Sequence, residues 1–242
     1  MKKMLGVVAG LFYTQLAFAS QAIYFGETLG IGENVRLDSF PEATSARNSF
    51  LSGLTGVGTE SFESYEDNAD SPVALDFSGI GLATLSGAGR VTSTLPGTTN
   101  GNGRYATDGD KYWQSIRDFT IDFDSPVSAF GFMGIDIGDR DGHVRLSLTT
   151  TGGSTQVINI DNTLDSPDGS VLFWGIIDSE NAFSRITFEN TAAGVDSFGF
   201  DQMTVGSPVP EPKTYTLMLA GLGLIGCMVY RREKMDSTIV AS

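Results

Sequence analysis

Between Ser61 and Val205 the chain is a succession of short apolar runs separated by Gly, Asp, Asn and Pro. This spacing constrains the fold more than any other feature. Apolar and polar residues alternate over Phe119–Phe123 and Val144–Leu148, the two-residue period of a half-buried strand. Gly152-Gly153 predicts a tight hairpin. The pattern predicts strands over 73–77, 80–85, 119–123, 127–133, 144–148, 155–160, 171–176, 183–188 and 197–205.

Short strands without intervening helices predict an antiparallel sandwich or barrel, and half-buried strands favour two packed sheets. We therefore predict a mainly β protein, an antiparallel β-sandwich of jelly-roll type over residues 59–207. Before it, residues 20–58 form an N-terminal segment with one short helix. Pro41 would open this helix, Gly53 would end it, and Ser39 is a candidate cap.

The first nineteen residues have the pattern of a secretory signal peptide. Lys2 and Lys3 precede an apolar stretch, and Ala17-Phe18-Ala19 offers the small residues that a signal peptidase needs. We expect export through the Sec machinery and cleavage after Ala19, with Ala22 as a second exit. The alternative is a retained membrane anchor.

The other end of the chain has three parts. Val209-Pro210-Glu211-Pro212 is stiff and extended because each proline restricts its own φ and the residue before it. Thr214–Tyr230 has no formal charge, and as a helix it would be about 25 Å long, within the spanning range. Arg231 and Arg232 follow and favour the cytoplasmic side. We predict a C-terminal transmembrane helix over 214–230, a cytoplasmic end over 234–242, and the body outside.

Pro210, Glu211 and Pro212, followed by a Gly-rich apolar helix and then Arg231 and Arg232, resemble the PEP-CTERM sorting signal of Gram-negative bacteria, here over 208–233. The resemblance implies that an exosortase recognises the tail and processes the chain near Pro-Glu-Pro. It implies an intermediate anchored in the inner membrane with a periplasmic body, then delivery to the outer surface or the medium. Such tails often accompany exopolysaccharide and biofilm systems.

The body is strongly acidic. Residues 20–208 hold nine basic and twenty-six acidic residues, which leaves a net charge of −17. A surface this negative repels nucleic acid, which excludes that class of partner, and it attracts divalent cations. The only cysteine, Cys227, lies in the tail, so the body has no disulfide.

One loop concentrates this charge. Asp136, Asp139 and Asp141 fall within six residues, with Gly138 and Gly142 among them, which suits a calcium ion held by oxygen ligands. It is not an EF-hand, because the twelfth position of such a loop would be a serine. The alternative is an ordinary polar turn, and the neighbouring Arg140 could neutralise the carboxylates without a metal.

Four short stretches also resemble exoproteins with PEP-CTERM tails and galactose-binding-like carbohydrate-binding modules. That resemblance implies a structural calcium between an early Glu and an Asp on the last strand, here Glu63 and Asp201. The stretches are Glu60–Glu63, Ala129–Phe132, Asp136–Asp139 and Phe198–Asp201.

Tyr112 and Trp113 stand beside acidic residues and are candidates for stacking on a sugar ring. Packing in the core is the preferred interpretation, because large aromatic side chains are mostly buried.

Catalytic motifs are scarce. His143 is the sole histidine, no Gly-x-Ser-x-Gly elbow occurs, and the body lacks zinc ligands. We predict that the chain is not an enzyme but an exported surface or matrix protein that binds calcium and exopolysaccharide. One alternative is a secreted carbohydrate-active enzyme with a carboxylate pair. Another is an ice-binding protein, although Thr149-Thr150-Thr151 would alternate between faces and build no flat array.

Overall fold

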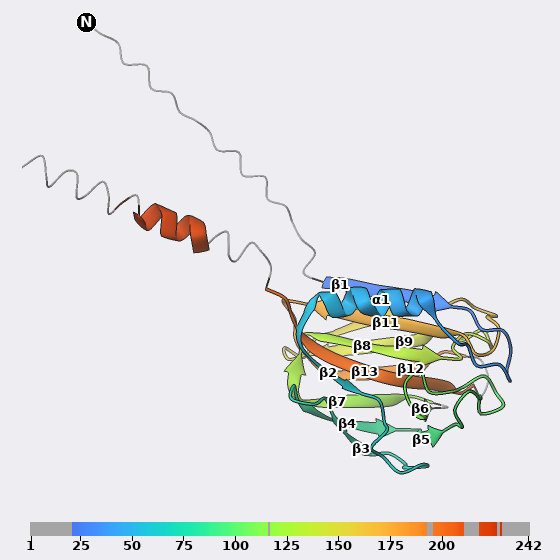
Figure 1. Cartoon of the computed structure of the whole chain (residues 1–242). Coiled ribbons are helices and arrows are strands. Elements are labelled where there is room, and N and C mark those ends of the chain that lie inside the picture. Colours follow the sequence, from blue (N-terminus) through green and yellow to red (C-terminus); the bar gives the residue numbers. More distant parts are fainter. Residues whose placement is uncertain (1–20, 116, 193–195, 211–217, 227, 229–242) are drawn as a thin grey trace, which may run out of the picture.

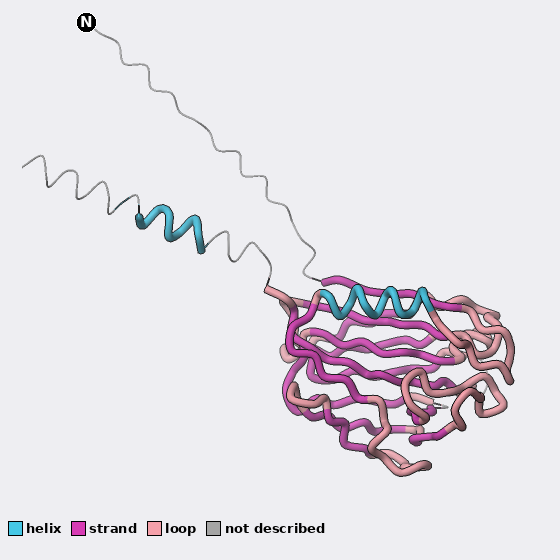
Figure 2. The backbone as a smooth tube through the Cα atoms, viewed as in Figure 1, coloured by secondary structure: helices cyan, strands magenta, loops and turns pink. Residues whose placement is uncertain are grey.

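The computed structural model describes residues 21–115, 117–192, 196–210, 218–226 and 228. Two antiparallel sheets pack face to face, as Figures 1 and 2 show, which confirms the predicted β-sandwich. A single helix in the body, α1 (Pro41–Ser52), lies on the outer face of one sheet, over β1 (Gln21–Thr28) and β11 (Val171–Asp178).

The first sheet has seven strands and the second has six. In the first, β1 and β11 are followed by β8 (Ala129–Ile135), β13 (Phe198–Pro208), β6 (Lys111–Ser115) and β5 (Arg90–Ser93), while β2 (Leu54–Glu60) pairs with the later part of β13. The second sheet runs β10 (Thr155–Asn159), β9 (Val144–Thr150), β12 (Phe183–Asn190), β7 (Phe119–Val127), β4 (Leu82–Gly87) and β3 (Val73–Asp76).

Aromatic side chains fill the space between the sheets. The alternation that predicted β7 turns Phe119 inward, where its ring stacks on Phe188 with centroids 4.3 Å apart. Phe132 and Phe200 from the facing sheet both pack edge-on against Phe188, and their own two rings are tilted against each other. Strands β8 and β11 are buried on both faces, because one face meets this core and the other meets α1.

Helix α1 begins at Pro41 and is followed by Gly53, as the sequence predicts. The expected Ser39 cap is wrong: Phe40 holds the cap position and no side chain caps the helix. The helix sits very close to β1, since a Cβ on Gly26 would lie 2.3 Å from the carbonyl oxygen of Glu42.

Strands β1 and β2 correct the predicted domain boundary. β1 pairs with β11 along its whole length and β2 pairs with β13, so the segment 20–58 supplies two strands of the sandwich instead of preceding it.

The sandwich has two distinct ends. Thr28, Val171, Ile135 and Gly199 form one row across the first sheet and mark what we call the far end. Gln21 pairs with Asp178 and Pro208 pairs with Leu54 at the opposite end, the exit end. The described chain therefore enters and leaves the sandwich at the same end (Figure 1).

Beyond Pro210 the structure describes a helix over 218–226. Within the described residues, no helix is long and apolar enough to cross a membrane. Residues 214–217, 227, 229 and 230 of the predicted span and the whole predicted signal peptide fall outside the described residues.

Candidate cation site

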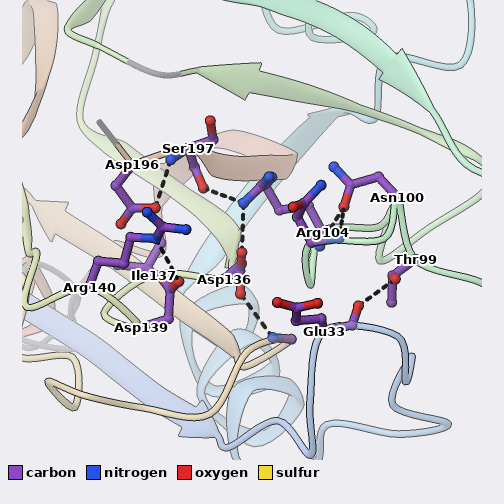
Figure 3. A network of polar contacts seen from close by, with 12 residues as sticks. Glu33, Thr99, Asn100, Arg104, Asp136, Ile137, Asp139, Arg140, Asp196 and Ser197 are labelled. Carbon is purple, nitrogen blue, oxygen red and sulfur yellow. Dashed lines mark hydrogen bonds and ion pairs between the residues drawn. The ribbon is translucent and has the colours of Figure 1, made fainter. Parts of the chain in front are cut away.

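A cluster of acidic side chains, which we call the acidic pocket, lies at the far end of the sandwich. Asp136 follows β8 and Asp168 precedes β11, and because these strands are antiparallel neighbours, the end of one meets the start of the other. Asp139 joins them, and the three residues each offer a carboxylate oxygen within 4.8 Å of the others. Asp196, just before β13, reaches the same region (Figure 3).

Asp136 is the innermost of these carboxylates. Its Oδ2 accepts a hydrogen bond from Nη1 of Arg104 at 2.7 Å, and its Oδ1 accepts one from the backbone N–H of Gly169 at 2.9 Å. Burial raises the pKa of Asp136 to about 7; the Gly169 bond and Arg104 lower it, while Asp139 raises it further. Arg104 also donates to the carbonyl of Ser197 at 2.9 Å, which ties the pocket to the start of β13.

Two oxygens of the pocket have no hydrogen-bond donor among the described residues: Oδ1 of Asp139 and Oδ2 of Asp196, both buried. The Asp139 side chain is only 10% exposed. Burial raises the pKa of Asp139, and next to burial the largest cause is Asp168. Burial and then Asp139 raise the pKa of Asp196 to about 6. Buried polar atoms are normally satisfied, so these oxygens have the environment that a bound cation would complete.

Two arginines face the carboxylates from different depths. Arg104 is inside the pocket and is committed to Asp136, whereas Arg140 is exposed, with Nε 3.7 Å from Oδ2 of Asp139. Figure 3 shows Arg140 beside Asp139 and Asp196, away from Arg104. Four carboxylates against two guanidinium groups leave an excess of negative charge.

The structure assembles the predicted loop differently from the sequence-based expectation. Asp136 and Asp139 are in the pocket, but Asp141 is exposed, with a backbone φ of +55°, and does not belong to the group of three. Asp168 and Asp196 were not predicted. Their only sequence signal is that each lies two or three residues before a strand, and using that signal requires the strand order.

Glu63 and Asp201 lie outside this pocket, and both accept hydrogen bonds from another loop, Thr107–Lys111. Asp201 is fully buried, and its Oδ2 accepts bonds from the backbone N–H groups of Thr107 (2.7 Å) and Asp108 (2.9 Å) and from the Thr107 hydroxyl. Burial raises the pKa of Asp201 to about 7, against these bonds. Oε1 of Glu63 accepts the N–H groups of Asp110 and Lys111 at 3.0 and 2.7 Å. The two carboxylates thus hold opposite ends of one loop.

Tyr112 and Trp113 are both completely buried. The Trp113 ring contacts Phe62 and Phe119 within the core. Neither ring has a face open to a sugar, which agrees with the packing interpretation and contradicts the ligand platform.

Residues 208–233 match the model of the PEP-CTERM protein-sorting motif. The chain carries a PEP-CTERM sorting tail. The match spans Pro210, Glu211, Pro212, Arg231 and Arg232, so the sorting resemblance is confirmed. A protein with a PEP-CTERM tail is exported and passes a membrane. A comparison with curated proteins gives no match.

Among solved structures, the body of this PEP-CTERM protein is similar to the K2 cleaved adhesin domain of Lys-gingipain, with 14% identity and a TM-score of 0.42, over 62% of this chain and 97% of that one. It is also similar to the C-terminal family 22 carbohydrate-binding module of Clostridium thermocellum Xyn10B, with 13% identity and a TM-score of 0.39, over 64% and 95%. A third similar structure is the CBM22-1 xylan-binding domain from Paenibacillus barcinonensis Xyn10C, with 13% identity and a TM-score of 0.35, over 62% of this chain and 94% of that one. Likeness at this level says nothing about a ligand.

Proposed function

We propose that the chain is a non-catalytic exported surface or matrix protein whose far end binds a calcium ion between Asp136, Asp139, Asp168 and Asp196. The observation that carries this proposal is the pair of buried, unpartnered oxygens on Asp139 and Asp196 beside two further carboxylates, as far as the described residues extend. A cation would satisfy both oxygens and would offset the burial, and next to it the neighbouring negative charge, that raise the pKa of each group.

Calcium fits the donor chemistry better than other common ions. The pocket offers carboxylate oxygens, which are hard ligands, and the body contains no thiol that would favour zinc. Calcium also accepts an irregular set of six to eight oxygens, whereas magnesium demands a near-ideal octahedron. Carboxylates from three separate loops make an irregular set.

We propose that the calcium-loaded site binds exopolysaccharide. A body with a net charge of −17 repels an anionic polymer, so direct contact with acidic sugars is unfavourable. A calcium ion in the pocket cancels the local excess of negative charge and can share sugar hydroxyl or carboxylate oxygens. Sorting by exosortase, from an inner-membrane intermediate with a periplasmic body to the outer surface, brings the site to that polymer.

A calcium titration tests the metal site. The body from Ser20 to Pro210, which contains every strand of the sandwich, should melt at higher temperature with calcium than with chelator. A hundredfold excess over Kd stabilises by about 2.7 kcal/mol. Asp139→Asn should remove this difference, whereas the exposed Asp141→Asn, in the same loop, should keep it.

Two other results would contradict the location or the metal. If Glu63→Ala or Asp201→Ala removes the calcium effect while Asp139→Asn does not, the ion is at the Thr107–Lys111 loop. If the wild-type body shows no calcium effect, the metal proposal fails.

Binding to acidic polysaccharides, measured with calcium and with chelator, tests the partner. We expect retention that depends on calcium and disappears with Asp139→Asn. Reducing sugar ends are counted in the same samples. Their appearance would support the carbohydrate-active enzyme instead.

A further inference from the structure

The exit end of the sandwich exposes apolar side chains. Val57, Ile80, Leu82 and Val209 are 42%, 36%, 53% and 44% exposed, and we call these four residues the apolar rim. Ile80 and Leu82 border a cavity of about 170 Å³ whose other walls include Phe123, Val127 and Val205. The cavity and the rim lie where the chain leaves the last strand. These four side chains are exposed and so add little to the packing of the core, although the body around them carries a net charge of −17. Exposed apolar groups of this kind mark surfaces that contact another molecule.

The chain is fixed to the body up to the sorting motif. The N–H of Val209 donates to the carbonyl oxygen of Gly53 at 2.9 Å, directly after the end of β13. From Pro210 to Thr214, the start of the apolar segment, there are four peptide links, which span at most about 14 Å. The headgroup layer on each side of a bilayer is about 5–8 Å thick. With the tail inserted, this link exceeds the headgroup layer by at most about 9 Å, so the exit end is held within that distance of the lipid surface.

We propose that the apolar rim rests in the headgroup layer of the membrane while the tail anchors the chain, so that the sandwich stands upright on its exit end. This inference rests on tail insertion, which is part of the proposed function. The partner is an uncharged lipid surface, because the acidic body gains nothing from anionic headgroups and the rim binds through apolar contact.

In an upright sandwich, the apolar rim lies at the membrane and the acidic pocket lies at the end farthest from it. The eight residues of β11 run from the far end to the exit end, a length of about 26 Å. The acidic pocket then faces away from the lipid while the rim touches it, so the anchored intermediate already presents the cation site outward.

Site-directed fluorescence tests the orientation in the full mature chain from Ser20 to Ser242. Cys227→Ser removes the only cysteine. Leu82→Cys on the rim and Ile31→Cys at the far end then each carry one fluorophore; the two native side chains are 53% and 67% exposed, so neither change disturbs the core. The chains are reconstituted into phosphatidylcholine vesicles that contain a lipid with a nitroxide near the headgroup.

We expect the nitroxide to reduce emission at position 82 at least twofold and to leave emission at position 31 unchanged. A second rim probe, Ile80→Cys, should repeat the result at position 82. If the chain floats with the vesicles but the two ends are quenched equally, or neither is, the upright orientation is overturned and tail insertion stands. If position 82 escapes quenching at every protein density while its emission shifts as the density rises, another copy covers the rim and the inference fails. If the chain does not float with the vesicles, tail insertion itself fails.

Discussion

Asp136 combines deep burial, a left-handed backbone conformation and a buried ion pair. It is 1% exposed, lies in the left-handed region with φ of +62°, and is bonded to Arg104 in a setting that raises its pKa to about 7. Breaking a buried ion pair from one side leaves the other charge without a partner, which costs more than the pair contributes.

Arg104→Ala should therefore lower the free energy of unfolding by about 3–5 kcal/mol in chelator at pH 8. Urea unfolding measures the effect. Arg185→Ala is the matched control, because Arg185 pairs with Asp122 at an exposed position and its loss should cost under about 1 kcal/mol. Equal losses in the two variants would show that the Arg104–Asp136 pair is not exceptional.

The acidic residues also predict how stability depends on pH. Asp136 and Asp201 have pKa values of about 7 and Asp196 of about 6, against 3.8 for the ordinary group, so between about pH 4 and pH 7 the folded chain binds more protons than the unfolded chain. Without calcium, the free energy of unfolding should therefore fall as the pH rises through this window. A difference of one pKa unit between the folded and the unfolded chain corresponds to about 1.4 kcal/mol.

Urea unfolding at pH 5 and pH 7.5 measures this slope in chelator and in calcium. Calcium should flatten it, because the ion binds the ionised carboxylates of the pocket, while Asp201 keeps part of the slope. A chelated protein that becomes more stable toward pH 7.5 would contradict the assignment.

At the scale of the element, sequence periodicity predicted nine strands, because β7 and β9 keep one face in the core and one outside, as β4 does. It missed β1, whose residues are nearly all half-exposed at a sheet edge, and β2, which contains two glycines. It also missed β5 and β6, which are only four and five residues long. Alternation of burial is the physical origin of the periodic pattern, so a strand without it can be found only from another signal, such as the continuous apolar run of β8 and β11.

The contact between β1 and α1 gives a test at this scale. Gly26→Ala would place a methyl group 2.3 Å from the Glu42 carbonyl oxygen and should push the helix away, at a cost of about 1–3 kcal/mol. Gly152→Ala is the control, because its new methyl group would find its nearest neighbour 3.8 Å away. Thermal unfolding of both variants measures the effect. A Gly26→Ala protein as stable as the control would show that the helix can move away from β1 at no cost in stability.

The candidate site was only half predictable, for a different reason. Asp136 and Asp139 are close in sequence, so their clustering could be seen directly, but so could that of Asp141, which the loop turns outward. Asp168 and Asp196 arrive from loops distant in the chain, through the adjacency of β8 with β11 and β13. Sequence alone does not give strand order, so it could not give these two residues.

For the whole molecule, the PEP-CTERM tail predicts the route. Glu211→Ala, within the matched segment 208–233, should leave the protein in the inner-membrane fraction, as should deletion of Arg231 and Arg232. Cell fractionation with immunodetection measures the distribution. Asp236→Ala, beyond the matched segment, should be sorted normally. Normal surface delivery of the Glu211 variant would refute the role of the motif.

The end of β13 at Pro208 separates attachment from architecture. Every described strand of the sandwich ends at or before Pro208, ahead of Pro210, Glu211 and Pro212. Among the described residues, the last hydrogen bond from the chain to the body is the one from Val209 to Gly53. A cut after Pro210 would therefore remove no strand and no carboxylate of the pocket. Tethered and released molecules would have the same affinity, and only the number of copies held together on one surface would change, which makes processing a control of avidity.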